Sequence, residues 1–244
     1  MQLLSSVQGN AYYESAVSPV FGNSPLFTAS ACVVSAGYSA GSTDGILSCF
    51  DSGASKGWRI GYTSNGSGGN ASLVATLGDG AGTLGLTLAL PQFMGRMFLV
   101  SLVVDNVGAA LYVNGQLGVI QSFITGYSGT ATQRLSLGAV NSGFGDPDGL
   151  KVFGVAFDPT SFSAFGAGQA FEALSQAEQM ASDVNFAGVV TEYAFAWDVP
   201  TGLQNPGTPI ASAIWTARAG GENLNFAGGG SQAALINYPH PVWA

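Results

Sequence analysis

Residues 99–118 (LVSLVVDNVGAALYVNGQLG) constrain the fold of this 244-residue chain more than any other segment. Asn114 and Gly115 stand between two apolar runs, and both residue types tolerate the positive φ that a type I′ turn requires. A further apolar run, which ends at Asp105, precedes them. The segment therefore predicts three consecutive antiparallel strands, with Asp105 ending the first strand and starting the first turn.

Short runs of β-forming composition recur along the rest of the chain, separated by turns rich in Gly, Asn, Ser and Asp. This spacing predicts an antiparallel β-sandwich. We expect strands at residues 26–35, 45–51, 58–62, 73–77, 83–90, 117–123, 134–138 and 150–157, with a short edge strand within residues 12–17 and another strand within 192–199. Apolar residues at spacings of three and four predict a short helix at residues 169–182.

The LYVNG hairpin, the order of the predicted strands and the segment AFDPTSFS before the predicted helix resemble laminin-G-like domains. These belong to the concanavalin A-like lectin/glucanase group. The resemblance covers residues 26–180 and implies an all-β, antiparallel jelly-roll β-sandwich of the concanavalin A-like type. Sandwiches of this group bind sugars, cut sugars, bind proteins or build assemblies, so the resemblance implies a fold and leaves the function open.

The chain is expected to divide into two parts. Residues 1–182 form the laminin-G-like sandwich, with residues 1–25 as a lead-in, and residues 183–244 form a C-terminal strand followed by an extended arm rich in Gly, Pro and aromatic residues. Four aromatic residues of the arm are candidate anchors for a partner protein: Trp215, Phe226, Tyr238 and Trp243. Such an arm either wraps over its own sandwich or docks on a neighbouring subunit.

The chain is unusually poor in charge. Only 8% of its residues are charged, against about 25% in ordinary globular proteins. Its surface must therefore expose uncharged polar and apolar groups, and exposed apolar patches mark interaction sites. This composition favours a protein held against other subunits, as a homo-oligomer or in a lattice. The net charge of −8 and the scattered basic residues argue against nucleic acid and against anionic membranes.

The sequence lacks the residues that catalysis would need. Glycan-cutting members of the group resemble one another in a Glu-x-Asp-x-x-Glu motif, which supplies a nucleophile and an acid/base about 5 Å apart. This chain has no such motif, and its one histidine, His240, lies between two prolines. Its glutamates are Glu14, Glu172, Glu178, Glu192 and Glu222, none of them in the predicted strands of the concave face. We expect a protein that is not an enzyme.

Calcium is the one cofactor for which the sequence offers candidate ligands. Asp146 and Asp148 stand in an Asp-Pro-Asp-Gly loop, and laminin-G-like domains often bind calcium at a loop rim through such oxygen ligands. The same residues are also good turn formers, which is the favoured alternative. Cys32 and Cys49 either form a disulfide, if their strands pair, or remain buried free thiols, and the second is favoured in a reducing compartment.

Two functions remain open at this point. The first is a non-catalytic structural protein, such as a capsid decoration or tail component of a virion. The alternative is a glycan-binding adhesin module for host-surface carbohydrate, with Trp58, Tyr62, Tyr112 and Tyr127 as available aromatic side chains. Residues 1–8 lack the cationic and apolar regions of a signal peptide. The expected location is therefore the host cytoplasm during synthesis and an assembled particle afterwards.

Overall fold

A computed structural model of the chain describes residues 2–6, 13–17, 19–35, 43–64, 71–89, 97–123, 127, 133–138, 150–159, 195–198, 214–219, 223–226 and 233–237. Within these ranges the chain forms antiparallel strands and one short helix, α1 (Pro19–Asn23). No helix in the described ranges is long and apolar enough to cross a membrane.

The first sheet has the strand order β10-β9-β8-β3-β12-β13. These strands are β10 (Gln116–Ser122), β9 (Gly108–Val113), β8 (Met97–Val104), β3 (Phe27–Ser35), β12 (Leu150–Asp158) and β13 (Phe195–Asp198). Beside this path, β1 (Gln2–Ser6) pairs with β12 and with β16 (Ala233–Asn237).

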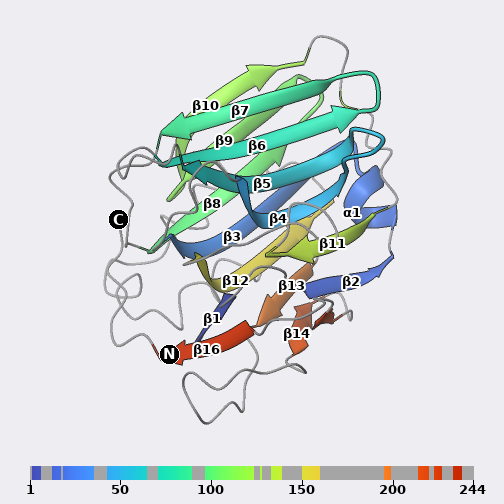
Figure 1. Ribbon diagram of the computed structural model, residues 1–244. Coiled ribbons are helices and arrows are strands. Elements are labelled where there is room, and N and C mark those ends of the chain that lie inside the picture. The colour runs from blue at the N-terminus through green and yellow to red at the C-terminus, as the bar shows by residue number, and fades with distance from the viewer. Residues whose placement is uncertain are drawn as a thin grey trace.

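The second sheet has the strand order β15-β2-β11-β4-β5-β6-β7. These strands are β15 (Leu224–Phe226), β2 (Tyr13–Val17), β11 (Arg134–Leu137), β4 (Thr43–Asp51), β5 (Lys56–Ser64), β6 (Ala71–Asp79) and β7 (Thr83–Ala89). β14 (Ile214–Ala219) pairs with β13 and with β15, so it joins the two sheets. The second sheet lies in front of the first in Figure 1. This antiparallel sandwich confirms the predicted fold class.

Aromatic side chains fill the space between the sheets. Trp58 and Phe27 are fully buried with ring centroids 4.9 Å apart, and Phe157 stacks on Trp58 at 5.8 Å. The indole N–H of Trp58 donates to the carbonyl of Phe21 in α1 at 2.7 Å. This bond satisfies the only polar atom of the tryptophan side chain, so the ring can be buried at little cost. The short helix thereby covers the end of the core beside β5.

The hairpin that dominates the sequence forms as expected. Asn114 and Gly115 have φ values of 51° and 76°, as a type I′ turn requires at its two central positions. The side-chain oxygen of Asn114 accepts a hydrogen bond from the backbone N–H of Leu99 at 2.9 Å. In the preceding turn, the carboxylate of Asp105 accepts from the N–H groups of Val107 and Gly108 at 2.7 and 2.8 Å.

The sandwich has one side on which both sheets end. β7 pairs only with β6 and β10 pairs only with β9 among the described strands. The two edges touch there, because a Cβ added at Gly118 would overlap the side chain of Leu88. Figure 1 shows both edge strands at the top of the molecule.

Two details differ from the sequence-based expectations. The strand near the N-terminus is not an edge strand, since β2 pairs with β11 on one side and with β15 on the other. Cys32 and Cys49 are free and buried. They lie on β3 and β4, which belong to opposite sheets and do not pair. The condition for a disulfide, a paired early hairpin, is therefore not met.

The described parts of residues 183–244 are integrated into the sheets. β13 extends the first sheet beside β12, and β15 pairs with β2 in the second. β16 pairs with β1, which brings segments from near both termini together. These parts of the expected arm thus pair within their own chain. The domain boundary at residue 182 stays a prediction, and the predicted helix at 169–182 lies outside the described residues.

Candidate functional site

The outer face of the second sheet carries a row of hydrogen-bonding side chains. Directly opposed residues of neighbouring strands lie on the same face of a sheet. The register aligns, strand by strand from β15 to β7, Asn225, Glu14, Ser136, Ser48, Arg59, Thr76 and Gly85. Trp58 and Ile60, on either side of Arg59 in the sequence, are fully buried in the core. The aligned residues therefore face outward, and we call them the polar row.

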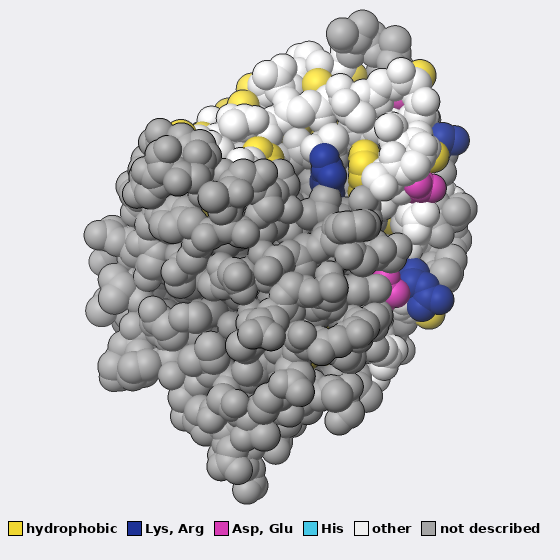
Figure 2. Space-filling model, in the orientation of Figure 1, with side chains coloured by type: hydrophobic (Ala, Val, Ile, Leu, Met, Phe, Trp, Pro, Cys, Tyr) yellow, Lys and Arg dark blue, Asp and Glu magenta, His cyan; other side chains and the backbone are white. Residues whose placement is uncertain are grey.

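From β11 toward the β7 edge, access to the polar row increases. Ser136 and Ser48 are buried, Arg59 and Thr76 are half-buried, and Gly85 is exposed. A Cβ added at Gly85 would meet no atom within 4 Å, so the space above this glycine is open. Figure 2 shows this face of the molecule, where the described surface is mostly backbone and uncharged polar groups with separate basic side chains.

Small and hydroxyl-bearing residues surround the open end of the row. Thr83, Gly85, Thr87 and Ala89 on β7 are opposed on β6 to Gly78, Thr76, Val74 and Ser72. The β7 residues are exposed, and Val74, Thr76 and Ser72 are half-buried. The hydroxyl groups of this sheet surface can both donate and accept hydrogen bonds.

Arg59 is the charged group in the centre of this face. Its guanidinium carbon lies 4.9 Å from the centroid of the Phe50 ring, within the range of a cation–π contact. Its Nε is buried and makes no hydrogen bond within the described part of the chain. Burial lowers the pKa of Arg59 from its usual value, because removal from water disfavours the charged form. The cation is thus partly desolvated and only partly compensated.

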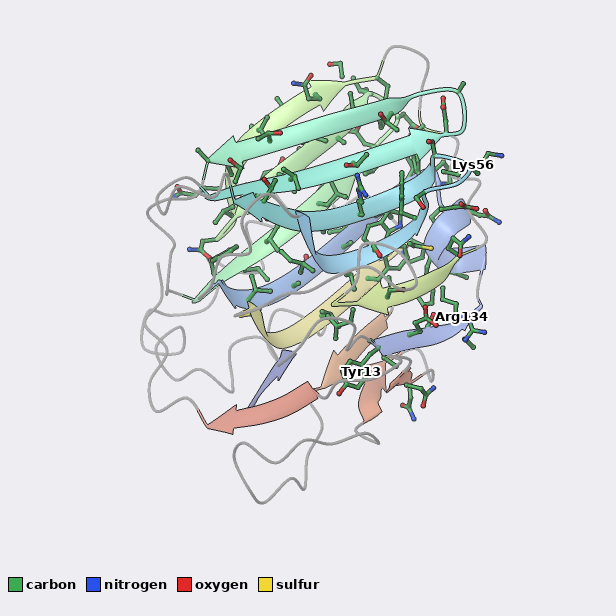
Figure 3. The ribbon with its side chains drawn as sticks, in the orientation of Figure 1. Tyr13, Lys56 and Arg134 are labelled. Atoms are coloured by element: carbon green, nitrogen blue, oxygen red, sulfur yellow. The ribbon has the colours of Figure 1, made fainter. Side chains whose placement is uncertain are left out.

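Glu14, the other charged residue of the polar row, forms an ion pair with Arg134 of β11. The Oε2 atom of Glu14 lies 3.8 Å from the Nε atom of Arg134. Burial raises the pKa of the Glu14 carboxyl, while Arg134 and a hydrogen bond from Ser136 act in the opposite direction. Figure 3 shows Arg134 and Lys56 toward one end of the second sheet. Three strand spacings of about 4.8 Å separate the positions of Glu14 and Arg59 in the row, or roughly 14 Å.

The described aspartates whose contacts are known shape turns. Asp51 accepts a hydrogen bond from the N–H of Ala54 at 3.0 Å. Asp79 accepts from the N–H groups of Ala81 and Gly82 at 2.8 and 2.9 Å. These backbone hydrogen bonds are the main reason why the pKa of each carboxyl lies below its usual value. Among the described residues, no cluster of three or more metal-ligating side chains occurs.

The site residues predicted from the sequence do not belong to the polar row. Trp58 is fully buried, and Tyr112 and Tyr127 are 4% and 8% exposed, so none of the three forms an open platform for a sugar. Tyr62 lies in β5. Trp215 pairs with Leu224 and Phe226 pairs with Tyr13 in the backbone ladder, and their role as anchors stays a prediction. Asp146, Asp148, Glu172, Glu178, Glu192, Glu222, Tyr238, His240 and Trp243 lie outside the described residues.

The sequence patterns did not single out Arg59 or Phe50. The signal was present in part, because the segment Trp58-Arg59-Ile60 alternates and an inward Trp58 forces Arg59 outward. What the sequence does not reveal is the strand order, which puts Arg59 in the middle of a sheet between Ser48 and Thr76 rather than on an edge.

No protein-family model and no curated protein matches the sequence. Solved structures share the fold. A proposed carbohydrate-binding protein from Bacteroides ovatus matches with a TM-score of 0.62 and 14% identity over 99% of this chain and 61% of that one. The chain thus spans about three fifths of that protein's length.

Two further structures match about two thirds of this chain. The heptameric SAP-like pentraxin from Limulus polyphemus has a TM-score of 0.54 and 12% identity, over 69% of this chain and 81% of that one. The CBM40 domain of the Ruminococcus gnavus IT-sialidase, bound to α2,3-sialyllactose, has a TM-score of 0.51 and 14% identity, over 67% and 94%. At such identities the likeness shows the fold, a sandwich shared with carbohydrate-binding and lectin-like domains.

Proposed function

We propose that this protein is a non-catalytic glycan-binding module, and that the glycan lies on the open end of the polar row over β6 and β7. The observation that carries this proposal is the combination of Arg59, Thr76 and the open space above Gly85 in one register. The likeness of the fold to carbohydrate-binding domains supports the same function.

The chemistry of the face suits a sugar. Sugar hydroxyl groups are donors and acceptors, and the threonine hydroxyls on β6 and β7 offer both functions. The guanidinium of Arg59 adds donors, and its contact with the Phe50 ring limits its freedom before any ligand arrives. Side chains held on a sheet lose little entropy when a ligand binds, which favours affinity.

A binding role rather than catalysis fits the carboxylates of the described region. Glu14 is the one glutamate whose side chain is described, and it is ion-paired with Arg134. Asp51, Asp79 and Asp105 hold turns. Glycoside hydrolysis needs two carboxyl groups across the scissile bond, and these residues are committed to other contacts.

A glycan array tests the proposal, with two glycine variants as a matched pair. Gly85→Leu and Gly82→Leu both add a side chain where a Cβ meets no atom within 4 Å, so both should fold. Only Gly85 lies in the polar row. We expect wild-type protein and Gly82→Leu to bind the same glycans and Gly85→Leu to lose at least tenfold in affinity. No binding by folded wild-type protein, or equal binding by both variants, would contradict the proposal.

A second candidate function, attachment to other copies of this chain, is favoured by one observation on the opposite sheet. Leu117 and Ile120 on β10 are 53% and 62% exposed, and Val107 in the adjoining turn is 69% exposed. β10 is an edge strand without a charged residue. An uncharged apolar edge can pair with a second copy, and it lets two chains of net charge −8 approach each other.

The oligomeric state in solution tests this second function. Wild-type protein should form a dimer or larger oligomer, and Ile120→Lys should shift it toward monomer, because a lysine on an edge strand opposes pairing. A wild-type monomer at high concentration would contradict the assembly role. A stable oligomer that Ile120→Lys leaves intact would exclude β10 as its interface.

A further inference from the structure

We infer that the glycan bound on this face is an acidic sugar, and that Arg59 binds its carboxylate. This inference rests on the proposed function and names the class of its ligand. The carboxylate belongs to either a sialic acid or a uronic acid, since both present the same group.

Among the described residues, Arg59 has no acidic partner. Glu14 in the same row is engaged by Arg134 at 3.8 Å, and lies about three strand spacings away, or roughly 14 Å. Asp51 and Asp79 hold turns through backbone hydrogen bonds. No ion pair between Arg59 and another described residue occurs.

The described neighbours of Arg59 are neutral. Ser48 and Thr76 oppose it on the two adjacent strands, and the Phe50 ring lies 4.9 Å from its guanidinium carbon. An aromatic face stabilises a cation but leaves the edge of the guanidinium plane able to donate hydrogen bonds. A carboxylate can accept two parallel hydrogen bonds from such a plane, which gives both charge compensation and orientation.

The overall charge of the chain opposes the approach of an acidic ligand. A net charge of −8 repels acidic ligands at distances up to about a Debye length, which is longer at low salt. A short-range contact with one partly desolvated arginine is then needed to bind an anion, and it is little screened by salt because the group is half-buried. Hydrogen bonds between the sugar hydroxyl groups and the uncharged residues of the polar row supply the remaining contacts.

The test uses matched ligands that differ in the carboxylate. By titration calorimetry we compare 3′-sialyllactose with its carboxyl methyl ester, and trigalacturonate with its methyl ester. A charge-assisted hydrogen bond contributes enough for the acidic member of one pair to bind roughly 10- to 100-fold more tightly. The pair that shows this difference identifies the source of the carboxylate.

Two variants at position 76 test whether a carboxylate of the protein can replace the ligand carboxylate at Arg59. Thr76→Glu puts a carboxylate directly opposite Arg59, where it should form a cross-strand ion pair and exclude the ligand carboxylate. Thr76→Gln has nearly the same size and no charge. We expect Thr76→Glu to abolish the preference for the acidic sugar. Thr76→Gln removes a hydroxyl group of the proposed site, so it should weaken binding of the acidic and the neutral sugar alike and leave the ratio of their affinities unchanged. Circular dichroism should be unchanged in both variants. Arg59→Gln should also abolish the preference.

The outcomes separate this inference from the function on which it rests. Equal affinity for acidic and neutral members of both pairs would overturn the inference and leave glycan binding standing. A preference that survives Arg59→Gln and Thr76→Glu would assign the carboxylate to another residue and also overturn it. Failure to bind any ligand in these pairs, together with an array without hits, would overturn both.

Discussion

Replacement of Asn114 by alanine should destabilise the protein by roughly 2–5 kcal/mol, the sum of two separate effects. Asn114 has a φ of 51°, and an ordinary side chain in the left-handed region costs about 1–2 kcal/mol. Its side-chain oxygen also accepts from the N–H of Leu99. Leu99 is 2% exposed, so that N–H would lose its partner away from water, at a cost of about 1–3 kcal/mol.

Two further variants separate these effects. Asn114→Gly relieves the backbone strain but removes the acceptor, so it should lose only about 1–3 kcal/mol. Asn114→Asp keeps an acceptor oxygen and tolerates a positive φ, and should lie within about 1 kcal/mol of wild type. Urea unfolding followed by circular dichroism measures all three. Equal stability of the alanine and aspartate variants would refute the reasoning.

Three other predictions concern buried groups. Burial raises the pKa of Glu14 above its usual 4.5, so wild-type protein loses stability as the pH rises through that raised pKa. Glu14→Gln has no such group, and its free energy of unfolding relative to wild type should therefore be higher at pH 7 than at pH 4. Parallel pH profiles of urea unfolding for the two proteins would contradict this. Cys32 and Cys49 are buried, with the pKa of Cys49 raised to about 12, so Ellman's reagent should react with them only after unfolding, and rapid reaction with folded protein would disprove their burial. Trp58→Phe should cost roughly 2–4 kcal/mol in urea unfolding, because it removes the hydrogen bond to the Phe21 carbonyl; a loss below 1 kcal/mol would contradict that role.

Local patterns in the sequence predicted much of the fold. Asn114 and Gly115 fixed the type I′ turn, and alternation around Trp58 placed a strand at β5. Such signals act over a few residues, so they survive in the sequence alone. β1, β14, β15 and β16 were missed, because their segments carry weak alternation and owe their structure to pairing with distant strands. Pairing of that kind cannot be derived from local propensity.

The candidate site was less predictable than the fold. The sequence drew attention to aromatic residues, but the tertiary structure buries Trp58, Tyr112 and Tyr127. The sequence offered no reason to prefer Arg59 over the other basic residues, because the neighbours of Arg59 in the polar row come from β4 and β6. A site built across a sheet joins residues that are remote in sequence, so strand order has to be known before the site can be recognised.

The position of a bound glycan tests the central claim most directly. A crystal structure of the complex with the strongest ligand from the array would show it. We predict that the sugar lies over β6 and β7 beside Gly85, with one of its oxygen atoms within hydrogen-bonding distance of the Arg59 guanidinium. A sugar bound elsewhere, with the face around Arg59 uncovered, would contradict the account.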